Sequence, residues 1–373
     1  MTGGKRLLFP AAALGLHLAA ATHPDVVEAW YSRAIFPRVA ASIALLTKSL
    51  PFAAAEPLLI GALLALGALG VRRLRLLRGP WRARLSEAGA RLAAVAGLVY
   101  LLFLLLWGLN YQRLTFARSS GLDVRPSTAR ELADVACILT ARADALRVGL
   151  PEDTAGVLRL TAGARDALAR TPLGFAAARD RFTFLGTTGA RPKPAFLSPL
   201  LSLLAISGIY SPFTAEPLVN AEVPDPDLPF CAAHEMAHAV GFAREDEANY
   251  LGSLACRLHP DADFRYSGTL AASASALEAL ARVDRDEARR LHDARSAAVK
   301  RDLEALTAWA LRHEGPVAEA SRRVNDAYLR SQGTRDGLAS YGRFVDLLIA
   351  EHRAEGRLPR SGGRPMDRAN LRP

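Results

Sequence analysis

Two histidines and a glutamate near the middle of the chain, His234, Glu235 and His238, form a His-Glu-x-x-His pattern. Residues four apart lie on one face of a helix, so both imidazoles can bind a single metal ion. Glu235 then lies beside that ion, where a carboxylate can take a proton from an activated water. The pattern therefore predicts a catalytic Zn²⁺ centre that hydrolyses amide bonds.

The sequence around these residues favours a helix. Asp227 and Pro229 are typical of a helix start, and Gly241 is typical of a helix end. The alternative interpretation is that His234 and His238 are ordinary polar residues on a surface helix. The apolar residues around them argue against this alternative, because uncompensated charge is costly in such surroundings.

A catalytic zinc ion usually takes a third protein ligand and leaves its fourth position to water. Residues 244–255 (REDEANYLGSLA) are predicted to form a second helix that packs back against the first. Glu245 and Glu247 are the candidates for the third ligand. Glu245 is preferred, because Asn249 follows it one turn later and can hydrogen-bond a ligand histidine. This E-x-x-A-N arrangement resembles the third-ligand motifs of several gluzincin peptidases.

The composition argues against a nucleic-acid partner. The chain of 373 residues has a formal net charge of +10 and a pI near 10.0. However, many of its arginines cluster beside an apolar stretch, and aromatic residues are few. Positive residues that flank membrane spans therefore account for the net charge better than a nucleic-acid-binding surface does. The three cysteines, Cys137, Cys231 and Cys256, do not make a disulfide framework. Cys231 is interpreted as a small core residue, with a Cys231–Cys256 bridge as the alternative.

Three apolar stretches, residues 7–22, 51–71 and 92–109, are predicted to cross a lipid bilayer, so that residues 1–111 form a membrane region. The first stretch could be a cleavable signal peptide, but an uncleaved span is preferred because further spans follow. Seven arginines between the second and third stretches face a single acid, which predicts a cytoplasmic loop. Everything after Asn110 then lies on the outer side of a bacterial inner membrane.

Two details of this membrane region bear on its topology. Glu56 lies near the start of the second span and is expected at the membrane interface. Residues 197–209 are apolar enough to suggest a fourth span. Serines, a proline and a glycine interrupt this stretch, and a span there would place the histidines in the cytoplasm, so the fourth span is rejected.

Residues 112–356 are predicted to form an α+β, mostly helical domain with a small sheet, followed by a disordered tail over 357–373. Helices are expected over 130–146, 154–171, 266–303, 306–312 and 337–350, another helix from 324, and strands over 182–185 and 205–210. The segment 208–213 is a candidate for pairing with a substrate backbone, or else a purely structural strand-turn. Tyr341 is a candidate for stabilising an oxyanion, or else a packed core residue.

The chain resembles the bacterial membrane proteins grouped as domain of unknown function 3810. The similarity rests on W-G-x-N-Y at 107–111, G-I-Y-x-P-F-T-x-E at 208–216, HExxHxxGFAxExEAN at 234–249 and S-Y-x-x-x-V-D-L-L at 340–348. It extends over nearly the whole chain and implies a zinc-dependent, peptidase-like domain without naming a substrate. Ala239-Val240 and Pro217 depart from the family pattern, and neither departure affects a proposed ligand.

These features predict a membrane-anchored zinc metallopeptidase with a zincin-like, gluzincin-like domain outside the cytoplasm, acting on a peptide or protein substrate. Glu235 is expected to act as general base and later to pass the proton to the leaving amine. The alternatives are a binding or sensor module with structural zinc, a zinc amidase acting on cell-envelope amides, and a scaffold with an incidental motif. Glu235 argues against structural zinc, because such a site needs no base.

Overall fold

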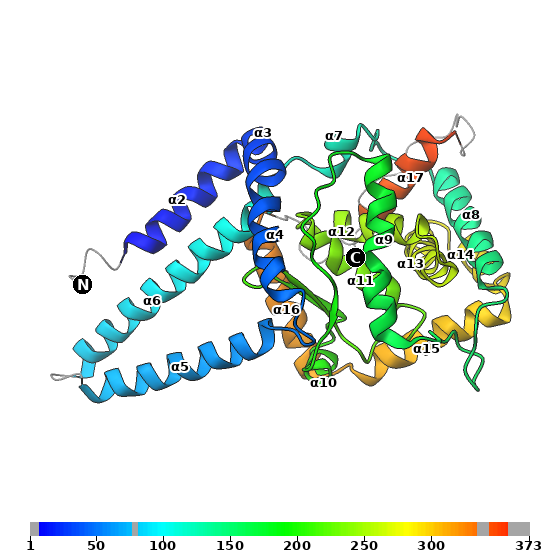
Figure 1. The fold of residues 1–373 in the computed structure, drawn as a ribbon. Helices are drawn as coiled ribbons and strands as arrows, with labels where there is room; N and C mark the ends of the chain where they lie inside the picture. Colours follow the sequence, from blue (N-terminus) through cyan, green and yellow to red (C-terminus); the bar gives the residue numbers. More distant parts are fainter. Residues whose placement is uncertain (1–6, 77–80, 334–342, 357–373) are drawn as a thin grey trace.

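Two long apolar helices, α5 (Ala55–Leu76) and α6 (Trp81–Leu106), project from a mostly helical body in the computed structural model (Figure 1). The structure describes residues 7–76, 81–333 and 343–356, so the predicted tail lies outside the described residues. Within this described part, α5 and α6 are the two helices long and apolar enough to cross a bilayer, and only 6% and 11% of their apolar stretches are buried. Exposed apolar surface of this length is typical of lipid contact.

The helix formed by the first of the three predicted spans is too short to cross a bilayer as α5 and α6 can. Helix α2 (Leu8–Thr22) has 15 residues, which extend about 22 Å, whereas a bilayer core is about 30 Å thick. It packs along α6, where Pro10 contacts Gly97 and the Tyr100 hydroxyl lies 3.0 Å from Nδ1 of His17. The prediction of three spans is therefore wrong: the described residues hold two candidate spans and a shorter apolar helix.

The chain between α2 and α5 packs against the body. It forms α3 (Pro24–Val26), the π-helix η1 (Val27–Ile35) and α4 (Phe36–Thr47). Helix η1 contacts η2 (Gly108–Gln112), the 3₁₀ turn that follows α6. Phe36 is fully buried in the same apolar core as the body.

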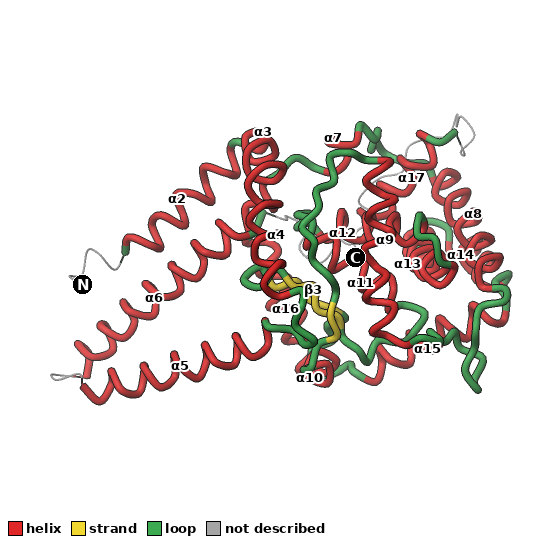
Figure 2. The backbone as a smooth tube through the Cα atoms, in the orientation of Figure 1, coloured by secondary structure: helices red, strands yellow, loops and turns green. Residues whose placement is uncertain are grey.

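The body is built around two helices, α11 (Leu228–Ala239) and α12 (Glu245–Arg257), which pack against each other (Figure 2). Helix α12 also packs against α13, and α13 packs against α8. Helix α9 contacts both α11 and α12. The remaining helices of the body are α7 (Phe116–Ser120), α8 (Ala129–Arg147), α9 (Gly163–Arg181), α13 (Ala262–Ala281), α14 (Arg285–Asp293), α15 (Ala297–Arg312), α16 (Pro316–Ser331) and α17 (Phe344–Ala354).

Most predicted helices are present with shifted ends. The helix over 130–146 is confirmed as α8, which begins at a capping box. The single helix predicted over 266–303 is instead divided among α13, α14 and the start of α15, because Asp284 caps a new helix by accepting a hydrogen bond from the Glu287 amide. The last predicted helix is present from Phe344 as α17, and residues 337–342 of that prediction lie outside the described residues.

The helix predicted over 154–171 is wrong in its first half, since α9 begins at Gly163. The Asp153 carboxylate accepts hydrogen bonds from the backbone amides of Ala155 and Val157. Such local bonds from an aspartate offer the backbone an alternative to helix formation. The chain therefore turns here before it enters α9.

A small three-stranded sheet lies beside α11, with the order β1 (Lys193–Pro194), β3 (Glu216–Val219), β2 (Gly208–Ser211). Strand β1 is parallel to β3, and β2 is antiparallel to it, with Gly208 opposite Val219. Among the described residues β2 pairs with β3 alone, so β2 is an edge strand. The strand predicted over 205–210 is thus confirmed only from Gly208. The short helix α10 (Ser198–Leu203) precedes it.

The strand predicted over 182–185 is wrong, because these residues form a turn. The rings of Phe182 and Phe184 pack around Phe116, with centroids 5.3 and 5.5 Å from its ring. Their apolar, aromatic character therefore reflects burial after α9 and not strand pairing.

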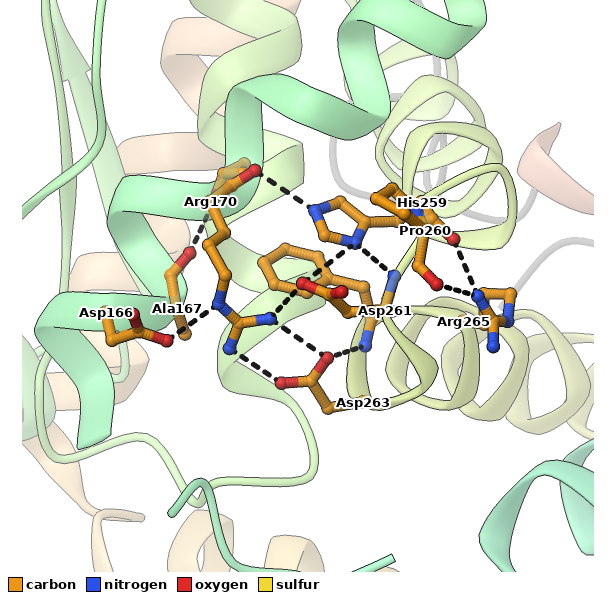
Figure 3. Close-up of polar contacts among 10 residues, drawn as sticks. Asp166, Ala167, Arg170, His259, Pro260, Asp261, Asp263 and Arg265 are labelled. Carbon is orange, nitrogen blue, oxygen red and sulfur yellow. Dashed lines mark hydrogen bonds and ion pairs between the residues drawn. The ribbon is translucent and has the colours of Figure 1, made fainter. Parts of the chain in front are cut away.

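Arg170 joins α9 to the start of α13 through a cluster of acidic residues (Figure 3). Its guanidinium donates hydrogen bonds of 2.7, 2.7 and 2.8 Å to Asp166, Asp261 and Asp263. The carbonyl oxygen of Arg170 lies 3.1 Å from Nε2 of His259, which stacks on a phenylalanine of α13. Because Arg170 binds carboxylates from α9 and from the start of α13, the cluster is a structural link between helices that support the site.

Candidate metal centre

Helix α11 places both histidines of the sequence pattern on one face. Its first turn contains Pro229. Proline suits this position because a backbone amide in the first turn of a helix has no acceptor within the helix. One turn apart, His234 and His238 have ring centroids 4.8 Å apart and Nε2 atoms 3.1 Å apart. Gly241 ends the helix with φ of 94°, a backbone conformation that favours glycine.

Helix α12 brings the third side chain to the same point. Glu245 is its first residue, and Oε2 of Glu245 lies 3.2 Å from Nε2 of His234 and 3.7 Å from Nε2 of His238. The two helices approach closely because residue 252 is a glycine: an added Cβ there would lie 2.9 Å from the backbone nitrogen of His234. Potential ligand atoms of the two histidines and Glu245 lie within 4.8 Å of one another.

The outer nitrogens of both imidazoles have partners that fix the rings. Nδ1 of His234 lies 2.8 Å from Oδ1 of Asn249, and Nδ1 of His238 lies 2.8 Å from the carbonyl oxygen of Phe242. Each Nδ1 can donate to its oxygen partner, which leaves Nε2 unprotonated toward Glu245. This is the tautomer that a metal ion requires.

The other candidate ligand, Glu247, binds elsewhere. Its Oε1 atom accepts hydrogen bonds from the backbone amide of Phe116 at 2.7 Å and from Arg244 at 3.1 Å. Glu247 therefore anchors the start of α7 to α12, while Glu245 alone of the two glutamates joins the histidines.

Glu235 is buried beside the histidines and against the edge strand. An added Cβ at Gly208 would lie 2.6 Å from Oε1 of Glu235, so β2 and this carboxylate are in contact. Burial raises the pKa of Glu235, and Glu245 adds to the rise, while the two histidines oppose it. A carboxyl group in this environment is a stronger base than an exposed one, as a proton acceptor requires.

The electrostatics of the three grouped side chains favour a cation between them. Burial alone would lower the pKa of His238, but the Glu245 carboxylate raises it to about 9. Burial would raise the pKa of Glu245, and the two histidines overcome this effect and lower it. The Glu245 carboxylate thus stays charged and favours a positive charge at the point that it shares with the two imidazoles.

The residues present fit a zinc ion. Two imidazole nitrogens and one carboxylate oxygen form the donor set of many catalytic zinc sites. Oε2 of Glu235 and Oε2 of Glu245 are buried and accept no hydrogen bond of good geometry. Buried carboxylate oxygens without donors call for a cation or an ordered water nearby. His234, His238 and Glu245 would hold the ion.

The turn between α11 and α12 is fixed by residues that the sequence interpretation missed. Arg113 is buried, donates hydrogen bonds of 2.9 Å to both carboxylate oxygens of Glu28, and donates one of 2.8 Å to the carbonyl oxygen of Gly241. Its guanidinium also lies 4.1 Å from the ring centroid of Phe242. The π-helix η1, which contains Glu28, therefore supports the turn whose carbonyl orients His238.

Trp107 is a second residue whose role the sequence did not reveal. In the sequence it is only the first residue of the W-G-x-N-Y segment at 107–111. Its indole nitrogen instead donates a hydrogen bond of 2.9 Å to the carbonyl oxygen of His238. Its ring also lies edge-on to the imidazole, with centroids 5.8 Å apart. The only sequence signal was its place directly after the apolar helix.

Two further residues singled out in the sequence, Tyr341 and Cys231, are not among the grouped ligands. Tyr341 lies outside the described residues. Cys231 is buried and its thiol lies 3.3 Å from Oδ2 of Asp227, and all three cysteines are free, so no Cys231–Cys256 disulfide is formed. Cys231 thus fits the interpretation as a small core residue.

A comparison with known protein families gives a match over most of the chain. A family model described as "Protein of unknown function (DUF3810)" matches residues 31–349. The matched range contains α6, β2 and both helices of the candidate centre. No curated protein and no solved structure matches the chain.

Proposed function

The chain belongs to this family of proteins of unknown function, DUF3810, and we propose that it is a membrane-anchored zinc peptidase with a zincin-like domain. One observation carries the proposal: His234, His238 and Glu245 meet at one point, with the buried Glu235 beside them. A structural zinc site would not need that fourth, unpaired carboxylate.

Each residue has a role that its position supports. His234, His238 and Glu245 hold Zn²⁺, which when bound supplies a Lewis acid for the attacking water and the scissile carbonyl. Glu235 accepts the proton of the water and passes it to the leaving amine, as its raised pKa favours. Asn249 keeps His234 in the tautomer that binds metal.

Strand β2 is the element best placed to hold a peptide substrate. It is an edge strand among the described residues, and its first residue, Gly208, lies against Glu235. An extended peptide that pairs with the free edge of β2 would run past the general base. Because Gly208 lacks a side chain, the peptide backbone can approach the carboxylate closely.

Helices α5 and α6 anchor the protein in the membrane, and the body lies outside the cytoplasm of a bacterial cell. The exposed apolar surface of both helices supports the anchor. The arginines at the end of α5, in residues 77–80 and at the start of α6 support the orientation, because arginine-rich connections between spans stay in the cytoplasm. The start of α5 and the end of α6, which join the body, then lie at the outer surface of the membrane.

The direct test is hydrolysis by the full chain in detergent, with a library of quenched fluorescent peptides as the probe. The zinc-loaded wild type is expected to cleave members of the library. Glu235→Gln is expected to keep its zinc and lose at least about 100-fold in rate, because it lacks the general base. Glu278→Gln, on the exposed surface of α13, is the control and should cleave normally.

Two results would contradict the proposal. A Glu235→Gln protein with full activity would show that the pattern is not catalytic. A zinc-loaded wild type that cleaves no peptide, but releases amines from amide-linked cell-envelope fragments, would identify an amidase that uses the same residues.

A further inference from the structure

Helix α10 turns both of its serines inward and two of its three leucines outward, while Leu201 packs against a small apolar cluster. Ser198 and Ser202 are 5% and 1% exposed, whereas Leu200 and Leu203 are 47% and 51% exposed. A helix on a water-facing surface has the opposite arrangement. Figure 1 places α10 at the edge of the body, near the point where α5 leaves it.

The inward serines are fixed by hydrogen bonds. The Ser198 hydroxyl accepts from the amide of Ala221 at 2.9 Å and donates to the carbonyl of Ala195 at 2.7 Å. The Ser202 hydroxyl accepts from the buried side chain of Asn220 at 2.9 Å. Rotating the helix to bury its leucines would break these bonds, so the outward apolar face belongs to the fold.

The surroundings of α10 extend the apolar surface. Phe196, two residues before the helix, is 84% exposed. The chain has no charged residue from Pro194 to Ala215. We refer to Phe196, Leu200 and Leu203 as the α10 face. A long uncharged segment with a large exposed aromatic side chain is unusual on a surface that meets only water.

The α10 face is joined directly to the first turn of α5. The Glu56 carboxylate accepts hydrogen bonds from the backbone amides of Phe196 at 2.9 Å and Leu197 at 2.7 Å. On α5 itself, Leu58 and Leu59 are more than half exposed and begin the apolar surface of the candidate span. Glu56 thus holds the α10 face at the level where α5 would enter the bilayer.

We propose that the α10 face lies in the outer boundary layer of the bilayer that α5 and α6 span. The proposal rests on the membrane anchor of the proposed function and not on its peptidase chemistry. Lipid is the occupant because the face continues the exposed apolar surface of α5 and lacks charge. Aromatic and leucine side chains are favoured at this depth, and the inward serines keep the polar groups in protein.

This placement has a consequence for the substrate. Strand β2 follows α10 in the chain, and its Gly208 lies against Glu235. With α10 in the boundary layer, the edge of β2 is close to the membrane surface. The substrate class that fits is a polypeptide segment that emerges from the bilayer or lies along it, in preference to a freely diffusing protein.

The test uses the full chain in phosphatidylcholine–phosphatidylglycerol vesicles, with the exposed Cys137 replaced by serine. Single cysteines that carry an environment-sensitive fluorophore are placed at Phe196→Cys, Leu203→Cys, Leu64→Cys on α5 and Val148→Cys. Leu64 and Val148 are 70% and 82% exposed, so both accept the label. Val148 directly follows α8, which Figure 1 shows on the opposite side of the body from α5. Quenching is measured with spin-labelled lipids and with iodide.

The Leu64 label is expected to be quenched by deep spin-labelled lipids, and the Phe196 and Leu203 labels by shallow ones. In each case the quenching should be at least about threefold stronger than that of the Val148 label.

If Leu64 is quenched while Phe196 and Leu203 behave like Val148, the proposal is wrong and the anchor stands. If neither lipid nor iodide quenches the α10 labels, a second copy or another protein covers the face, which also overturns it. If Leu64 is not quenched, the anchor and the proposal fail together. The zinc content and activity of the same vesicles test the peptidase separately.

Discussion

The indole nitrogen of Trp107 donates a hydrogen bond of 2.9 Å to the carbonyl oxygen of His238. Trp107 directly follows Leu106, the last residue of α6. One of the two histidines of the candidate centre is therefore tied to the end of an apolar helix with the length of a membrane span. Through this contact, the apolar helix α6 and the candidate metal centre belong to one structural unit.

Replacement of Trp107 should destabilise the fold more than replacement of an unbonded tryptophan. Trp107→Phe removes the donor to the buried carbonyl of His238, which should cost about 1 kcal/mol and lower the Tm. Trp309→Phe is the control, because the indole nitrogen of Trp309 has no hydrogen-bond partner. Thermal unfolding of the detergent-solubilised proteins measures the effect. Equal Tm values for the two variants would contradict a supporting role for Trp107.

Asn249→Ala should weaken zinc binding about 10- to 100-fold, because His234 loses the oxygen partner that fixes its tautomer. Asn249→Asp keeps an oxygen at that position and should retain most of the affinity. Competition with a fluorescent chelator measures the affinity. Asn325→Ala, on α16 and outside the candidate centre, is the control. Unchanged affinity in Asn249→Ala would show that the contact is not needed for metal binding.

Gly208→Ala should impair hydrolysis while zinc remains bound. The added Cβ would lie 2.6 Å from Oε1 of Glu235, so the carboxylate must move. Gly186→Ala is a matched loop substitution, since its Cβ would meet only Pro37 at ordinary contact distance. Peptide hydrolysis and zinc content are measured on the same preparations. Full activity in Gly208→Ala would separate Glu235 from the reaction.

The stability of the fold should depend on the ionisation of Glu131 between about pH 4.5 and 2. Hydrogen bonds from Arg353 of α17, together with the cap at Thr128, lower the pKa of Glu131 from 4.5 to about 2. Because the folded pKa lies below the unfolded one, the stabilisation is complete above pH 4.5 and is lost as the pH falls toward 2.

Glu131→Gln should therefore lower the Tm at pH 7, and its difference from wild type should shrink as the pH falls below about 4. Glu304→Gln, at an exposed position on α15, is the control and should follow the wild type at every pH. A constant difference between Glu131→Gln and wild type from pH 7 to pH 3 would contradict the assigned ionisation.

The grouping of His234, His238 and Glu245 could be anticipated from the sequence because it depends on short-range geometry. A four-residue spacing sets the histidines on one face, and a glycine turn with a second helix returns Glu245 to them. The sequence favoured Glu245 as the third ligand and kept Glu247 as the alternative. In the structure Arg244 and the amide of Phe116 bind Glu247, a contact across distant parts of the chain.

The supporting residues could not be anticipated, because their contacts join distant segments. Arg113 pairs with Glu28, and Trp107 bonds His238 across an even longer interval. The wrong prediction of a strand at 182–185 has a related cause, since its aromatic residues are buried around Phe116. A fourth span at 197–209 was rejected partly because of its serines, and two of these, Ser198 and Ser202, form the inward face of α10.

The central claim is that His234, His238 and Glu245 hold zinc, and metal analysis of the purified full chain tests it most directly. Wild type and Glu247→Gln should each contain one zinc per chain, although Glu247→Gln should be less stable. His238→Ala and Glu245→Ala should contain little zinc while they retain the helical circular dichroism spectrum. A well-folded wild type without zinc, even after incubation with the metal, would contradict the account, as would a Glu245→Ala protein with full zinc content.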